Sequence, residues 1–136
     1  MITAVDTSVL LDVFGADRTF GPRSKEALRR CVAEGGLVAC DAVWAETASF
    51  FPDIAHAADA LARLGVEYSP TTLEAALAAA TAWKAYRDRG GQRDRVVADF
   101  LIGSHALALA ERLLTRDRGF YRAHFSRLRV LDPSRD

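Results

Sequence analysis

Apolar residues alternate along the chain between short continuous runs and longer stretches in which they recur at helical spacing. The short runs contain valine or leucine and extend over only a few residues. Such runs are typical of strands that are buried on both faces of a parallel sheet. We predict five strands, at residues 1–5, 37–40, 66–70, 112–116 and 128–132.

The longer stretches carry start and stop signals of helices. Asp41 precedes one of them as a cap, and paired glycines at 35–36 and 90–91 end two others. Strands that alternate with helices favour a parallel sheet covered on both faces. The expected fold is therefore a three-layer α/β/α domain over residues 1–136 with a central parallel sheet. The predicted helices cover 7–14, 24–36, 42–51, 52–64 and 71–91, one begins at about 95, and a short turn lies at 119–125.

Composition narrows the class of protein. Of 136 residues, 50% are hydrophobic and 26% are charged, as in ordinary globular domains. No apolar run approaches the ~18 residues of a membrane span, and the start of the chain lacks the features of a signal peptide. We therefore expect a cytoplasmic protein with no membrane contact. Cys31 and Cys40 match no zinc pattern and are expected to be small buried apolar residues.

Four carboxylates are expected near one edge of the sheet. Asp6 ends the first strand, Asp117 ends the fourth, and Glu46 lies in the first turns of the helix after the second. Asp99 interrupts the apolar stretch "VVADFLI" near the start of its helix. Because the carboxyl ends of parallel strands open a crevice at one edge, we expect the four side chains to converge on one pocket.

Each of these residues also has a purely structural interpretation. Asp6 and Asp117 could each cap the helix that follows, the helix dipole favours Asp99, and Glu46 could be an ordinary solvated residue. Asp99 fits this interpretation worst, because an ionised carboxylate among apolar neighbours needs a compensating partner. Four acids at one edge favour a shared divalent cation.

Carboxylate oxygens without nearby histidine or cysteine select Mg²⁺, or Mn²⁺, rather than zinc. Such an ion suits phosphodiester hydrolysis, because it activates a water and stabilises the departing oxygen. The sequence has no P-loop, no G-x-S-x-G elbow and no G-x-G-x-x-G after a strand. The residues thus predict a metal-dependent hydrolase with Asp6, Glu46, Asp99 and Asp117 as catalytic and metal-binding residues.

Charge is distributed unevenly along a chain whose formal net charge is zero. Residues 1–86 hold 7 basic and 11 acidic residues, whereas residues 87–136 hold 11 basic and 7 acidic ones. Sixteen of the 18 basic residues are arginine, which is suited to bidentate phosphate contact. The basic region is either a nucleic-acid footprint or a solvated face. If it is a nucleic-acid footprint, the candidates for phosphate contact are Arg93, Arg95, Arg112 and Arg116.

Four segments in series, "DTSVLLDVF", "AETASFF", "ADFLIGSHAL" and "LLTRDRGFY", resemble the acidic motifs of PIN-domain ribonucleases, and especially of VapC-type toxins from bacterial toxin–antitoxin pairs. The resemblance extends over essentially the whole chain. It implies a single PIN domain and Mg²⁺-dependent endoribonuclease activity. It also implies that Asp6 and Asp99 are the principal metal ligands, that Glu46 and Asp117 complete the set, and that Thr7 and Thr115 line the site.

The same resemblance implies two protein partners, a second copy of the chain in a homodimer and a cognate antitoxin. The antitoxin's tail would lie in a groove between N-terminal helices. Aromatic candidates for the lining of that groove, which could equally be ordinary core residues, are Phe14, Phe20, Trp44, Phe50 and Phe51.

Two kinds of alternative remain open. One is a PIN-fold interaction module without catalytic activity. The other is a receiver or phosphatase-type α/β domain with an acidic pocket. A receiver needs a lysine at the end of a strand, but Lys25 and Lys84 both lie in predicted helices. A haloacid-dehalogenase-type phosphatase needs Asp-x-Asp after the first strand, where this chain has Asp6, Thr7 and Ser8.

Overall fold

The computed structural model describes residues 1–92 and 95–135, and its centre is a five-stranded sheet. The strand order is β3-β2-β1-β4-β5, and every neighbouring pair is parallel. All five predicted strands are present, and the predicted parallel sheet is confirmed. The strands are β1 (Ile2–Val5), β2 (Gly36–Ala39), β3 (Val66–Tyr68), β4 (Arg112–Leu114) and β5 (Val130–Leu131).

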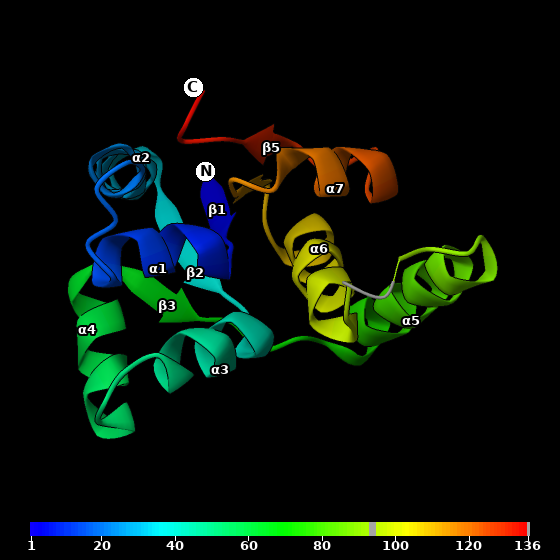
Figure 1. The fold of residues 1–136 in the computed structure, drawn as a ribbon, viewed down its shortest axis with the longest axis horizontal. Helices are drawn as coiled ribbons and strands as arrows, with labels where there is room; N and C mark the ends of the chain where they lie inside the picture. The colour runs from blue at the N-terminus through cyan, green and yellow to red at the C-terminus, as the bar shows by residue number, and fades with distance from the viewer. Residues whose placement is uncertain (93–94, 136) are drawn as a thin grey trace.

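Helices cover both faces of this sheet (Figure 1). α1, α2 and α4 lie on one side, and α5, α6 and α7 lie on the other. This arrangement follows from right-handed crossovers that run outward from β1 first in one direction and then in the other. The three-layer α/β/α fold is therefore confirmed. The helices are α1 (Thr7–Phe14), α2 (Gly21–Glu34), α3 (Asp41–Ser49), η1 (Ile54–His56), α4 (Ala57–Arg63), α5 (Leu73–Asp88), α6 (Val97–Leu109) and α7 (Arg118–His124).

The central strand, β1, positions the later parts of the chain around it. Ala4 pairs with Val38 of β2 on one side and with Leu113 of β4 on the other. All three residues of β4 are buried, as are Thr3, Ala4 and Val5 of β1. These strands are buried on both faces, which explains why they appear in the sequence as continuous rather than alternating apolar runs.

Some element boundaries differ from the predicted ones. β4 ends at Leu114 and β5 comprises only two residues, because their ladder joins just Leu113 to Val130 and Leu114 to Leu131. The helix predicted from 52 divides in two, since the Asp53 side chain accepts a hydrogen bond from the Ala55 backbone N–H at 3.0 Å and opens the 3-10 turn η1 before α4.

Where the chain is described, none of its helices combines the length and the apolar character needed to cross a membrane.

Candidate active site

Asp6 lies at the C-terminal end of β1 and caps α1. Its Oδ1 accepts a hydrogen bond from the Thr7 backbone N–H at 2.8 Å, and its Oδ2 accepts one from the Thr115 hydroxyl at 2.7 Å. Only 7% of Asp6 is exposed. Burial raises the pKa of Asp6 from 3.8 to about 6, and the nearby charges of Asp117 and Glu46 act in the same direction. Asp6 therefore caps α1, as the structural interpretation predicted. These hydrogen bonds do not fully offset the cost of burying its negative charge.

Glu46 is joined to this position through Thr7. Its Oε1 accepts a hydrogen bond from the Thr7 hydroxyl at 2.7 Å, which connects α3 to the first residue of α1. Glu46 itself is exposed, so its second oxygen is accessible. Thr7 therefore contacts one acid through its backbone and a second through its side chain.

Asp117 does not end β4 directly, as was predicted, but follows it by three residues at the N-cap position of α7. Its side chain makes no capping hydrogen bond. Instead both of its oxygens accept hydrogen bonds from the Arg95 guanidinium, one of them, Nη2 to Oδ1, at 3.2 Å. The backbone N–H of Asp117 donates to the Thr115 hydroxyl at 2.9 Å. Thr115 therefore links Asp117 to Asp6.

Asp99 occupies the first turn of α6. Its Oδ2 accepts a hydrogen bond from the Val96 backbone N–H at 3.1 Å, which is a capping interaction, and its Oδ1 lies 3.9 Å from Nη1 of Arg95. The helix starts at Val97 rather than at the predicted position 95, because Val96 has extended backbone angles. This geometry is compatible with Asp99 as a helix cap and with Asp99 as a metal ligand.

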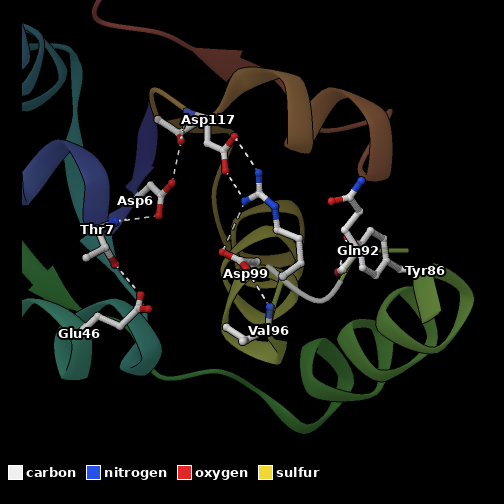
Figure 2. A network of polar contacts seen from close by, with 10 residues as sticks. Asp6, Thr7, Glu46, Tyr86, Gln92, Val96, Asp99 and Asp117 are labelled. Atoms are coloured by element: carbon white, nitrogen blue, oxygen red, sulfur yellow. Dashed lines mark hydrogen bonds and ion pairs between the residues drawn. The ribbon is translucent and has the colours of Figure 1, made fainter. Parts of the chain in front are cut away.

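Figure 2 shows these groups together, with Asp6, Thr7 and Glu46 on one side and Asp99 and Asp117 facing them. We call Asp6, Glu46, Asp99 and Asp117 the acidic site. The four acids are linked to one another through Thr7, Thr115 and Arg95. Among the described residues, however, no three acidic, histidine or cysteine side chains are close enough to hold a metal ion as they stand.

A divalent cation fits the acidic site by chemistry but not by the present side-chain arrangement. The donors are hard oxygens, and Asp6 is a buried carboxylate whose ionised form lacks a full counter-charge. The obstacle is the Arg95 guanidinium, which already contacts Asp117 and Asp99. The residues therefore suit Mg²⁺ or Mn²⁺ only after a rearrangement of side chains.

The four arginines predicted to contact phosphate have different environments. Arg93 lies outside the described residues. Arg95 belongs to the acidic site, where it contacts Asp117. Arg112 is 5% exposed, donates to the Thr3 hydroxyl at 2.8 Å, and stands at the start of β4, away from the edge that carries the site. Its prediction as a phosphate contact is wrong, because its guanidinium is buried.

Arg116 lies next to the site but is engaged with Asp12. Its Nε and Nη2 donate to the two oxygens of Asp12 at 2.7 and 2.9 Å, and its guanidinium lies 4.0 Å from the centre of the Phe20 ring. The Ser24 hydroxyl donates to the same carboxylate at 2.8 Å. The described contacts of Arg116 are therefore structural ones.

Tyr121 is a residue of the site region that the sequence analysis missed. It lies on α7 and is 1% exposed. Burial raises the pKa of its phenol, and the charges of Asp6, Asp99 and Asp117 raise it further, which places the phenol near three of the four acids. Its position could have identified it from the sequence, because it lies four residues after Asp117, one turn along the helix that Asp117 begins.

Several solved structures resemble this chain in fold. The VapBC-1 structure from nontypeable Haemophilus influenzae superposes with a TM-score of 0.75 at 18% identity, over 99% of this chain and 100% of that chain. VapBC2 from Rickettsia felis, bound to a DNA fragment from its promoter, gives 0.73 at 17% identity, over 97% and 98%. VapC20 from Mycobacterium tuberculosis, a sarcin–ricin loop cleaving toxin, gives 0.61 at 20% identity, over 93% and 98%.

At these identities the structural likeness shows a shared fold. No curated protein sequence matches the chain. Residues 3–126 match the PIN domain family, and this range includes all four acids of the site. The chain therefore belongs to the PIN domain family.

Proposed function

We propose that this protein is a metal-dependent endoribonuclease that hydrolyses RNA phosphodiester bonds and acts as the toxin of a type II toxin–antitoxin pair. The observation that carries the proposal is the acidic site itself, in which Asp6, Glu46 and Asp117 come together from separate elements. Structural neighbours described as VapBC and as a toxin–antitoxin complex, and one described as a sarcin–ricin loop cleaving toxin, support the same function.

In this proposal the four acids hold one or two Mg²⁺ or Mn²⁺ ions. Bound there, such an ion lowers the pKa of a water molecule and stabilises the developing charge on the leaving oxygen. Thr7 and Thr115 keep Glu46 and Asp6 in place through hydrogen bonds of 2.7 Å each.

The most direct test is cleavage of total RNA by the purified protein in millimolar Mg²⁺ or Mn²⁺, with EDTA as the negative control. We expect cleavage products only when the metal is present. Thermal melting in the same buffers gives a second measurement, since a cation that binds only the folded acidic site raises the melting temperature by mass action. Identical melting with and without metal would contradict a shared metal pocket.

The proposed protein partners are a cognate antitoxin and a second copy of the chain. Three of the predicted groove residues form one cluster between α1 and α3. The Phe14 and Phe51 rings meet edge to face at 5.0 Å, and Phe50, which is 50% exposed, packs against Phe51 at 6.4 Å. Phe20 and Trp44 pack elsewhere, against Arg116 and Tyr68. We therefore place the antitoxin contact at Phe14, Phe50 and Phe51.

The catalytically inactive interaction module is the second candidate. It would bind the antitoxin but would neither cleave RNA nor respond to metal. Expression of the protein in a host with and without a candidate antitoxin gene separates the two. A toxin acting on cytoplasmic RNA should stop growth unless the antitoxin is present, whereas an inactive module should not.

A further inference from the structure

Arg95 is the only basic residue among the described residues whose guanidinium contacts two acids of the acidic site. It precedes α6 and reaches toward Asp117, 22 residues further along the chain. Nη1 and Nη2 each donate to a different oxygen of Asp117, and Nη1 also lies 3.9 Å from Oδ1 of Asp99. The guanidinium therefore lies between two of the proposed metal ligands.

The local packing favours this position of Arg95. Its guanidinium carbon lies 4.2 Å from the centre of the Phe120 ring, which is within the range of a cation–π contact. Its side chain and that of Asp99 are each 25% exposed, so water screens their charges only in part. Before this residue in the chain, the Tyr86 hydroxyl donates to the Gln92 carbonyl at 2.7 Å, which holds Gln92 against α5.

A guanidinium and a divalent cation need the same oxygens here. Arg95 uses both oxygens of Asp117 in a bidentate pair, which is the strongest arrangement for an arginine and a carboxylate. A cation bound to Asp117 and Asp99 would also lie next to a like charge and be repelled by it. Metal binding to Asp117 and the contact of Arg95 with the same carboxylate therefore compete.

We propose that Arg95 is the internal counter-cation of the acidic site: it neutralises Asp99 and Asp117 in the metal-free protein and has to release Asp117 when a divalent cation binds. This inference rests on the proposed metal site. It gives Arg95 a role different from the phosphate contact expected from its charge alone. It also explains why the acids come together in this structure without forming a cluster that is ready for a metal.

The test is calorimetric titration of the full-length protein with Mn²⁺, and separately with Mg²⁺, for the wild type, Arg95→Gln and Arg122→Gln. Arg122 is exposed on α7, so its variant removes the same charge without touching the acidic site. We expect Arg95→Gln to bind Mn²⁺ about tenfold more tightly than the wild type, which corresponds to about 1.4 kcal/mol. Arg122→Gln should bind the ion as the wild type does.

Melting temperatures give an independent measurement. In EDTA, Arg95→Gln should melt below the wild type, because Asp99 and Asp117 lose their counter-charge. In saturating Mn²⁺ the difference should disappear, because the ion then neutralises both acids. Arg95→Lys, which keeps the charge but loses the bidentate geometry, should have an intermediate Mn²⁺ affinity and serves as the second variant if Arg95→Gln does not fold.

Equal or weaker Mn²⁺ binding by Arg95→Gln would overturn the inference, and weaker binding would mean that Arg95 orders the ligands instead of competing for them. Either result leaves the proposed nuclease intact, provided that the wild type binds Mn²⁺ and cleaves RNA. If neither the wild type nor Arg95→Gln binds the ion, the proposed metal site is wrong, and so is the proposed competition between Arg95 and the metal.

Discussion

The hydroxyl of Thr115 donates a hydrogen bond to Oδ2 of Asp6 at 2.7 Å, although the two residues lie 109 positions apart in the chain. The same hydroxyl accepts the backbone N–H of Asp117 at 2.9 Å. A single fully buried side chain thus ties the end of β1 to the loop after β4. This oxygen contacts two proposed metal ligands directly, and the backbone hydrogen bond from the Asp6 N–H to the Leu114 carbonyl at 2.9 Å supports the same arrangement.

We expect Thr115→Val to destabilise the protein by about 1–3 kcal/mol, because valine keeps the shape but leaves Asp6 and the Asp117 N–H without their partner. The measurement is denaturant unfolding in EDTA. Thr115→Ser is the matched control, since it keeps the hydroxyl and loses only a methyl group. A valine variant as stable as the serine variant would show that this hydrogen bond contributes little.

The raised pKa of Asp6 predicts a pH dependence of stability in the absence of metal. Unfolded Asp6 releases its proton near pH 3.8, whereas the folded protein retains it up to about pH 6. Between these values the folded state binds more protons, so its stability falls as the pH rises. The stabilising contribution is full below about pH 4 and is lost by about pH 6.

A comparison of the wild type with Asp6→Asn separates the contribution of Asp6 to this pH dependence from the contributions of the other carboxylates. In EDTA, the variant should gain stability relative to the wild type as the pH rises from about 4 to about 6, by up to about 3 kcal/mol. Denaturant unfolding at pH 4, 5, 6 and 7 measures the difference. A constant difference across this range would mean that Asp6 is already ionised at pH 4. Saturating Mg²⁺ should remove the gain, because a bound cation favours the ionised carboxylate.

Asp99→Asn should abolish RNA cleavage and leave the fold intact. Asparagine still accepts the hydrogen bond that the Val96 N–H now donates to Asp99, but it lacks the charge that holds a cation. We expect a loss of several orders of magnitude in cleavage rate, with metal-free stability within about 1 kcal/mol of the wild type, since the partly exposed contact with Arg95 is worth little. A variant that cuts RNA at nearly the wild-type rate would reduce Asp99 to a helix cap.

Arg116 should matter for stability rather than for RNA affinity. Asp12 is 4% exposed and depends on Arg116 for its counter-charge, so Arg116→Met should cost about 2–4 kcal/mol. Adding Asp12→Leu should recover most of this loss, and Arg122→Met is the exposed control. RNA binding by an Asp99→Asn background should keep its salt dependence when Arg116 is replaced. A weaker dependence of RNA affinity on salt concentration in the Arg116 variant would indicate that Arg116 does contact phosphate.

The positions of the acids could be predicted because they follow from the backbone. Continuous apolar runs identify buried parallel strands, and the residues that follow such strands meet at one edge. Asp6 and Glu46 are placed by this reasoning alone. Asp117 was assigned to the right edge even though β4 ends three residues earlier than predicted.

The partners of the side chains could not be predicted in the same way. Nothing in the local sequence shows that Arg95 turns toward Asp117 or that Arg116 meets Asp12, since these contacts join segments 22 and 104 residues apart. The position of Arg112, in contrast, could have been predicted from the pattern of apolar residues. It begins a buried strand, so it lies at the opposite edge from the site that the same strand helps to form.

The order of the strands also determines when the acidic site can exist. β1 lies between β2 and β4, so Asp6 and Glu46 come from about the first third of the chain, while Asp99 and Asp117 come from the last third. During synthesis the three strands β1, β2 and β3 are made before β4 and β5. A nascent chain therefore lacks part of the acidic site until Asp99 and Asp117 have been made and β4 pairs with β1, so we expect the proposed nuclease to be inactive while it is being translated.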